Sequence, residues 1–270
     1  MHLTQYQVDA FTNHLFGGNP AAVVPLQDWL PEPVMQAIAL ENNLSETAFF
    51  VALGPGRFHL RWFTPVEEVA LCGHATLATS HVIFTHIGVE GDAIVFDSLS
   101  GPLTVTRSAE GYTLDFPTQP IERLSDVETY TEVIGASVLE AWRSMDDMAV
   151  VATAEEVHQV KPDMGKVAAL NTRGLIVTGP GGGAFADCDF VSRFFAPLHG
   201  IPEDPVTGSA HCILAPYWSN RLGKREMVAR QISARGGHLR VRYAGERTFI
   251  TGQAVDFMKG EIRLPSPGDA

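Results

Sequence analysis

Cysteine, positive charge and long apolar runs are all scarce in this sequence. Its 270 residues include 3 cysteines, an odd number without metal-site spacing, which argues against a disulfide framework or a zinc site. Lys and Arg number 19 against 31 Asp and Glu, and the formal net charge of −12 disfavours nucleic acids and anionic membranes as partners. No stretch approaches the roughly 18 to 20 apolar residues of a membrane span. The start, MHLTQYQVDAF, lacks the basic and apolar parts of a secretory signal. These absences predict a soluble, cytoplasmic protein.

Sequence motifs for nucleotides and metals are missing as well. The Gly-rich segment 179–183 lacks the Lys-[Ser/Thr] of a P-loop, and no Gly-x-Gly-x-x-Gly opens a helix after a strand. We interpret this segment as a flexible hairpin loop. The histidines are scattered singly, without a His-Glu-x-x-His grouping. The sequence therefore predicts neither a metal nor a cofactor.

The residues that are present predict a strand-rich α+β protein. Apolar residues make up 45% and charged residues 19%, which is typical of a folded globular chain. Helices are expected over 31–42 and in longer stretches from Gly73 and from Gly208, where Pro216 should kink the helix or end it early. Short apolar runs bounded by turn residues read as strands. They cover 6–11, 21–24, 47–51, 58–63, 94–96, 112–116, 174–177, 238–243, 248–250 and 254–257.

An internal repeat divides the chain. Arg-Trp-Phe-Thr-Pro at 61–65 is echoed by Arg-Phe-Phe-Ala-Pro at 193–197, and Gly-His-Ala from Gly73 is echoed by Gly-Ser-Ala from Gly208. In each copy a strand is followed by a loop and an apolar helix, and a helix that is apolar nearly all round is buried. The repeat predicts two related halves, 1–115 and 116–270, each with strands around one helix. The C-terminal residues are free to pack back on the first half.

The two repeated helix starts are candidate anion sites. Unpaired backbone N–H groups and a partial positive charge gather there, and Gly73 and Gly208 let a ligand approach closely. His74 and Ser209 would each add a donor. Taken singly, Ser209 is more simply a helix cap and His74 a satisfied core histidine. Their equivalent places in the repeat favour a binding role for a small carboxylate substrate.

Two acidic residues are candidates for proton chemistry. On a strand, Glu46 would share a face with Ala48 and Phe50, where lost hydration should raise its pKa toward neutrality. The alternative is an exposed glutamate at a strand edge. Asp204, five residues before Ser209, could orient His74 or accept a hydrogen bond from substrate, or it could only form a turn.

The position of Cys72 invites a catalytic interpretation too. It directly precedes the Gly73 helix start, where a thiol can have a lowered pKa and act as nucleophile or base. An unreactive, buried cysteine is the commoner case.

Several motifs together resemble the PhzF-like family of phenazine-biosynthesis proteins, in order and over nearly the whole chain. They are Val-Asp-Ala-Phe-Thr at 8–12, Gly-Asn-Pro-Ala-Ala-Val-Val at 18–24, Leu-Ser-Glu-Thr-Ala-Phe at 44–49, Leu-Cys-Gly-His-Ala-Thr at 71–76, Asp-Pro-Val-Thr-Gly-Ser-Ala at 204–210 and Gln-Ile-Ser-Ala-Arg-Gly-Gly at 231–237. The resemblance implies the diaminopimelate-epimerase-like fold, with two pseudo-symmetric halves, each a barrel-like sheet around a central helix. It also implies catalysis without a metal or nucleotide, and a homodimer.

The resemblance further implies roles for individual residues. The best understood member isomerises a hydroxylated dihydroanthranilate, and its proton-transferring glutamate is matched by Glu46. The family's active-site His, Asp and Ser positions fall on His74, Asp204 and Ser209, and Gly73 supplies backbone contacts.

One departure bears on the mechanism. Epimerases and racemases of the wider superfamily use a cysteine in each half, but here the second position is Thr207. A single-base proton shift by Glu46 suits the residues better than two-base inversion. The alternatives are an amino-acid epimerase, racemase or dehydratase that uses Cys72, or a binding protein without activity.

Overall fold

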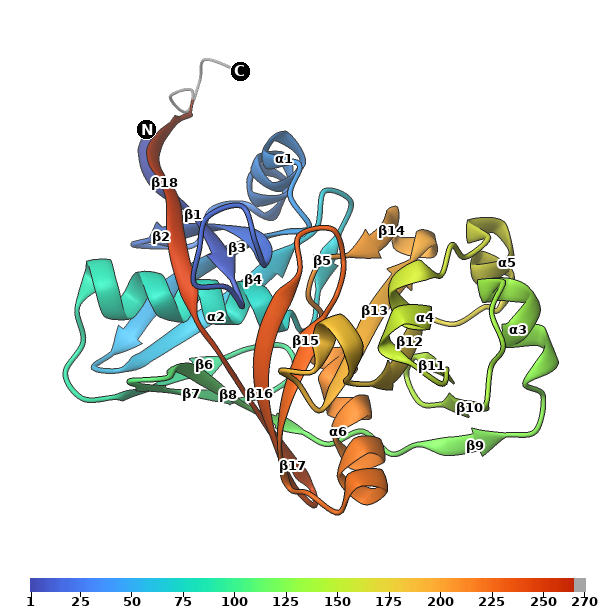
Figure 1. The fold of residues 1–270 in the computed structure, drawn as a ribbon. Helices are drawn as coiled ribbons and strands as arrows, with labels where there is room; N and C mark the ends of the chain where they lie inside the picture. Colours follow the sequence, from blue (N-terminus) through green and yellow to red (C-terminus); the bar gives the residue numbers. More distant parts are fainter. Residues whose placement is uncertain (265–270) are drawn as a thin grey trace. The chain divides into compact units, whose positions relative to one another are not determined.

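Two compact units make up the chain in the computed structural model, which describes residues 1–264 (Figure 1). The first unit comprises residues 1–115 together with the chain from Thr251, and the second comprises 116–250. Strand β18 (Ala254–Arg263) belongs to the first unit because it pairs antiparallel with β1 (His2–Ala10) along the whole length of β1. The C-terminal strand thus packs back on the N-terminal half.

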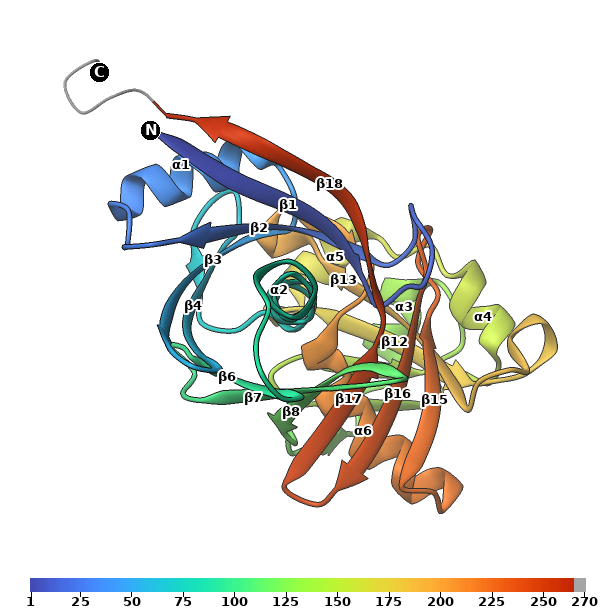
Figure 2. The ribbon, with the colours of Figure 1, turned by 90° about the vertical axis from the view of Figure 1, so that its left-hand side faces the viewer.

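The sheet of the first unit encloses a buried helix. Strand β2 pairs in parallel with β3, β3 antiparallel with β4, β4 in parallel with β6, and β6 and β7 continue antiparallel to β8. Figure 2 looks along α2 (Gly73–Val82) and shows these strands around it. Almost every residue of α2 is buried, as its lack of a polar face predicts. The strands are β2 (Asn19–Leu26), β3 (Glu46–Gly54), β4 (Arg57–Phe63), β5 (Glu68–Val69), β6 (Ala93–Asp97), β7 (Leu103–Ser108) and β8 (Gly111–Pro117).

The second unit repeats this order of strands. Strand β11 pairs in parallel with β12, β12 antiparallel with β13, β13 in parallel with β15, and β15 antiparallel with β16. Helix α6 (Gly208–Leu222) lies between β14 and β15, as α2 lies between β5 and β6 in the first unit. The shared topology is the one that the sequence repeat predicts. The strands are β9 (Glu122–Leu124), β10 (Glu140–Arg143), β11 (Asp147–Val150), β12 (Leu175–Pro180), β13 (Phe190–Ala196), β14 (Ile201–Asp204), β15 (Glu226–Gln231), β16 (Gly237–Ala244) and β17 (Arg247–Gly252).

The repeated arginine has the same task in both units. Arg61 binds both carboxylate oxygens of Glu68 at 2.7 and 2.6 Å, and Arg193 binds those of Glu203 at 2.7 and 2.8 Å. Each guanidinium also lies over the phenylalanine two residues further on, at 5.1 and 4.9 Å from the ring centre. The motif therefore ties a central strand to the short strand that precedes the buried helix, β5 in the first unit and β14 in the second.

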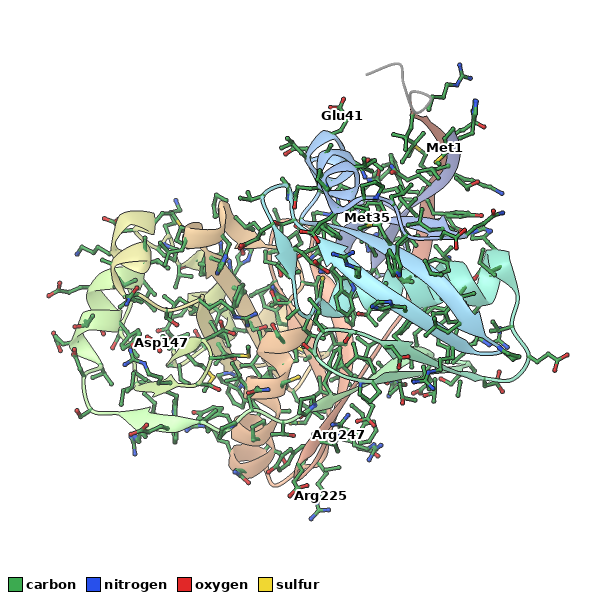
Figure 3. All side chains as sticks on the ribbon, turned by 180° about the vertical axis from the view of Figure 1, so that it is seen from behind. Met1, Met35, Glu41, Asp147, Arg225 and Arg247 are labelled. Atoms are coloured by element: carbon green, nitrogen blue, oxygen red, sulfur yellow. The ribbon has the colours of Figure 1, made fainter. Side chains whose placement is uncertain are left out.

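The remaining helices lie outside the strand repeat. Helix α1 (Glu32–Asn42) carries Met35, labelled in Figure 3, which belongs to one core cluster with Phe49 and Phe63. The helix ends at Asn42, as predicted, and Asn43 after it has the left-handed conformation. Three short helices were not predicted, although a capping box from Thr153 marks the start of one of them. These helices are α3 (Glu128–Ile134), α4 (Ala154–Gln159) and α5 (Met164–Ala169), and single turns lie at η1 (Ile83–Ile87), η2 (Gly183–Phe185) and η3 (Pro197–His199).

Pro216 does not end its helix early. Helix α6 runs through it to Leu222, so the prediction of an early end was wrong. Proline removes the N–H that would bind the carbonyl of Cys212 one turn earlier. That carbonyl instead accepts a hydrogen bond of 3.1 Å from the N–H of Gln119, so the lost partner is replaced from a neighbouring segment.

The Gly-rich segment 179–183 is part of a hairpin, as predicted. It leads out of β12, which pairs antiparallel with β13, and it runs into the single 3₁₀ turn η2. Over residues 1–264, no helix is both long and apolar enough to span a bilayer.

Candidate active site

Glu46 and His74 face one another in the first unit. Glu46 opens β3 directly after α1, and His74 is the second residue of α2. His74 Nε2 lies 3.2 Å from Glu46 Oε2, and the two side chains are 4% and 14% exposed. The structure thus brings together two residues that the sequence singled out separately.

Two donors converge on the other imidazole nitrogen. Asn19 Nδ2 lies 3.1 Å from His74 Nδ1, and Cys72 Sγ lies 3.5 Å from the same atom. With the amide nitrogen of Asn19 directed at Nδ1, Nδ1 is the acceptor and the imidazole proton sits on Nε2, on the side of Glu46. Asn19 therefore selects the tautomer of His74.

Asn19 was not among the predicted site residues. It begins β2 and is fully buried, and Gly18 before it has φ +61°. A Cβ at Gly18 would lie 2.0 Å from the carbonyl oxygen of Ala10, so only glycine allows this entry into the strand. The signal in the sequence was a Gly-Asn-Pro triplet, which reads as an ordinary turn.

Burial keeps His74 neutral. The loss of hydration lowers its pKa from 6.5 to about 3, so at neutral pH the imidazole beside Glu46 is uncharged. In the described part of the chain, no group forms a hydrogen bond of good geometry with His74 Nε2. A buried donor of this kind can serve a further partner, which is compatible with a role for His74 beyond packing.

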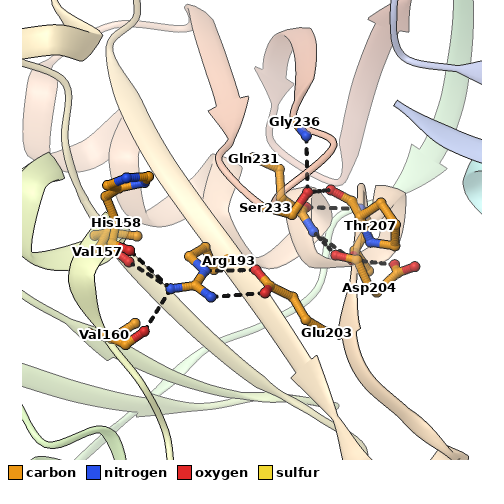
Figure 4. A network of polar contacts seen from close by, with 11 residues as sticks. Val157, His158, Val160, Arg193, Glu203, Asp204, Thr207, Gln231, Ser233 and Gly236 are labelled. Atoms are coloured by element: carbon orange, nitrogen blue, oxygen red, sulfur yellow. Dashed lines mark hydrogen bonds and ion pairs between the residues drawn. The ribbon is translucent and has the colours of Figure 1, made fainter. Parts of the chain in front are cut away.

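In the second unit, Asp204 and Thr207 form a closed polar network (Figure 4). Thr207 Oγ1 donates to Asp204 Oδ2 at 2.5 Å, and the backbone N–H of Thr207 donates to Gln231 Oε1 at 2.9 Å. Gln231 Nε2 in turn donates to the Asp204 carbonyl at 2.8 Å. These bonds fix the loop that enters α6, so Asp204 does more than form a turn.

Ser209 belongs to a different contact chain. Arg173 Nη2 donates to Ser209 Oγ at 2.9 Å, and the same guanidinium makes two bonds to the carboxylate of Asp146, which is fully buried. Because Arg173 occupies a lone pair of Ser209, the serine hydroxyl keeps its hydrogen for another acceptor. Arg173 and Asp146 were not predicted, since nothing in the sequence connects them with residue 209.

Neither repeated helix has a side-chain cap at its start. The residues before Gly73 and Gly208, Cys72 and Thr207, have extended backbones and make no capping hydrogen bond. Ser209 is not the cap of α6, because Thr207 holds that position and Ser209 is the second residue of the helix. Both helices present first-turn N–H groups that no cap side chain satisfies, as an anion site requires.

A second buried histidine, His211, leads to a prediction about stability. Its Nδ1 donates to the Thr207 carbonyl at 2.8 Å, and within residues 1–264 its buried Nε2 has no hydrogen-bond partner. Burial lowers its pKa from 6.5 to about 4. Between about pH 4 and pH 6.5 the histidine is protonated in the unfolded chain but not in the folded chain. The free energy of unfolding therefore rises with pH over this range, and stability is lost as pH falls below 6.5.

We expect the free energy of unfolding to fall by on the order of 2 kcal/mol for each of His74 and His211 between pH 7.5 and pH 5. Urea denaturation at several pH values measures this loss. His211→Gln cannot titrate, so its loss should be smaller by about one histidine's share, whatever its stability at pH 7.5. An unchanged pH dependence in this variant would show that His211 is charged in the folded protein.

Two α+β units that share one strand order and one helix position define a diaminopimelate-epimerase-like fold, which agrees with known structures. A hydroxyproline epimerase from Agrobacterium vitis has a TM-score of 0.66 at 9% identity, over 98% of this chain and 94% of that one. This likeness is one of fold alone, and it confirms the predicted fold class.

The chain belongs to the phenazine biosynthesis-like family, PhzC-PhzF, whose profile matches residues 8–260. An uncharacterized isomerase of Pseudomonas aeruginosa is 48% identical over 265 residues, which cover 98% of this chain and 100% of the relative. The crystal structure of a PhzF-family phenazine biosynthesis protein from Enterococcus faecalis has a TM-score of 0.93 and 47% identity, over 98% of this chain and 100% of that one. The predicted family membership is thereby confirmed.

Proposed function

We propose that the protein is a cofactor-independent isomerase that moves a proton on a small carboxylate substrate, with Glu46 as the single acid and base. The observation that carries this proposal is the pairing of Glu46 with a neutral His74 at the start of α2. A carboxylate at a mostly enclosed place can accept a proton, and the N–H beside it can bind the charge that then develops.

The reaction needs no redox partner. The Glu46 carboxylate removes a proton from a substrate carbon, so a C–H bond breaks and an O–H bond forms. The electron pair passes into the conjugated system of the substrate, stabilised by the Nε2–H of His74. Glu46 then returns the proton to a different carbon, which leaves a shifted double bond and no net change in oxidation state.

We assign substrate positioning to the two helix starts. The first-turn N–H groups at Gly73 and Gly208, with the Ser209 hydroxyl that Arg173 orients, suit a carboxylate of the substrate. Asp204, which the bonds of Thr207 and Gln231 hold in place, suits a substrate amine or hydroxyl.

An epimerase or racemase that uses Cys72 is the second candidate, because this thiol lies 3.5 Å from His74 Nδ1. Inversion by two bases needs another thiol. At the equivalent place, Thr207 is hydrogen-bonded to Asp204, and a hydroxyl is too weakly acidic for the task. Cys212, one turn into α6, cannot replace it, because burial raises the pKa of this thiol to about 12.

Proton exchange with solvent tests the proposal directly. The protein is incubated in D2O with a hydroxylated dihydroanthranilate, the substrate that the family resemblance suggests, and with a panel of conjugated amino and hydroxy carboxylates. We expect deuterium at a carbon of the product, together with a moved double bond. Inversion at one carbon, seen by chiral chromatography, would favour the epimerase instead. No exchange in any carboxylate of the panel would support a binding protein without activity.

A further inference from the structure

A second cluster of ligand-type side chains lies in the first unit, apart from Glu46 and His74. His86 Nε2 is 3.0 Å from both carboxylate oxygens of Asp256, and His81 Nε2 is 3.3 Å from Asp256 Oδ1. All three ligand atoms lie within 4.8 Å of one another. The sequence suggested no metal site, because Asp256 is far away in the chain and the two histidines are five residues apart.

A spacing of five does not place two side chains on one face of an ordinary helix. In an α-helix such residues point roughly 140° apart. Here α2 passes into the single π-helical turn η1, in which the N–H of Gly88 binds the Ile83 carbonyl five residues earlier, at 2.8 Å. The wider turn brings His81 and His86 to one side. Turns of this kind are rare and often lie at functional sites.

The third ligand comes from a second irregular piece of backbone. In the pairing of β1 with β18, Gln7 is opposite Met258 while Val8 is opposite Asp256, so Phe257 is an extra residue in β18. Such a bulge bends the strand and redirects the side chains beside it. A π-turn and a β-bulge thus occur at the two places that supply the three ligand atoms.

We propose that His81, His86 and Asp256 bind a divalent transition metal ion, with Zn²⁺ the best match. Zinc bonds of about 2.0–2.1 Å in tetrahedral geometry place ligand atoms about 3.3 Å apart, close to the separations of 3.0 and 3.3 Å found here. Two imidazoles and one carboxylate leave a fourth position for water. The side chains are 12, 26 and 40% exposed, so an ion can enter from solvent.

Neighbouring residues already orient both imidazole rings for metal binding. His81 Nδ1 lies 3.1 Å from the hydroxyl of Tyr112, which fixes the ring with Nε2 toward Asp256. The His86 ring stacks on Tyr6, with 4.6 Å between ring centres. A bound ion would join the end of α2 and its π-turn to the C-terminal strand, so it should stabilise the first unit.

Metal binding to the full-length, EDTA-treated protein without a polyhistidine tag tests this proposal. We expect one equivalent of ZnCl2 to bind in calorimetry and to raise the melting temperature. His86→Gln and Asp256→Asn should each weaken the affinity for Zn²⁺ by about 100-fold and remove the shift in melting temperature. His158→Gln, which alters an exposed histidine of the second unit, is the matched control and should change neither.

Cobalt identifies the ligands independently of stability. Glu46, Cys72 and His74 also lie close enough together to hold an ion, but only that group would give a thiolate-to-cobalt charge-transfer band with CoCl2. We expect a Co²⁺ spectrum without this band, and we expect Cys72→Ala to leave it unchanged. Zinc binding that survives both Asp256→Asn and His86→Gln, or no binding to the parent protein, would overturn the proposal and leave a plain ion-pair cluster.

Discussion

Replacing Glu46 by glutamine should reduce turnover by roughly 10²–10⁴-fold while the protein stays folded. Glutamine has nearly the same shape, so β3 should still begin at this position and keep its parallel register with β2, in which Glu46 is opposite Ala21. The change removes the carboxylate oxygen that lies 3.2 Å from His74 Nε2. Deuterium exchange into the substrate measures the loss, and a thermal melt confirms the fold.

A neighbouring glutamate provides the matched control for this experiment. Glu41 lies near the end of α1, five residues before Glu46, and its side chain is exposed (Figure 3). Glu41→Gln makes the same chemical change outside the proposed site, so exchange should continue at the parent rate. A comparable loss in both variants would point to a general effect on the fold and not to proton transfer.

Cys72→Ala separates the two candidate mechanisms. If Glu46 acts alone, removal of the thiol costs only the contact with His74 Nδ1, to which Asn19 still donates, and turnover should fall less than about 10-fold. If the thiol is the base, this variant should be inactive. Activity that persists in Glu46→Gln but disappears in Cys72→Ala would reverse the proposal in favour of the epimerase mechanism.

The sequence predicted the architecture well because its signals are local or repeated. Ten of the apolar runs became strands, and the Gly73 and Gly208 helix starts appeared where the repeat placed them. Very short strands, such as β9 with three residues, carry too few side chains to show an alternating pattern. Pro216 misled because the partner that replaces its missing N–H comes from residue 119, almost a hundred positions away.

The candidate site could be predicted only in part, because some of its residues act through contacts with residues far away in the sequence. Glu46 and His74 stand in unusual local patterns, whereas Asn19 and Arg173 matter only through one contact each to a distant residue. The pair His81 and His86 was missed because the expected α-helical geometry separates them, and only the π-turn brings them together. Side-chain roles that depend on one long-range contact leave no periodic trace in a sequence.

The protonation state of His74 leads to the last prediction, which concerns two replacements of this residue. A neutral histidine with its proton on Nε2 acts as a hydrogen-bond donor, whereas a histidine that titrates near neutrality would act as a proton carrier. Burial lowers the pKa of His74 to about 3, which supports the first role. Glutamine can imitate that role, because its amide N–H reaches about as far as Nε2, but it cannot carry a proton.

We therefore expect His74→Gln to keep within about 10-fold of the parent turnover, and His74→Phe to lose roughly 10²–10³-fold, the usual cost of one missing donor to a developing negative charge. Deuterium exchange under saturating substrate measures both, and the difference should lie in kcat more than in KM. Nitrogen-15 NMR of the imidazole should show a single neutral form from pH 8 down to about 5, with the proton on the nitrogen that faces Glu46. Equal losses in the two variants, or an imidazole that titrates near pH 6.5, would mean that His74 carries the proton itself, and Glu46 would then share the acid and base work with it.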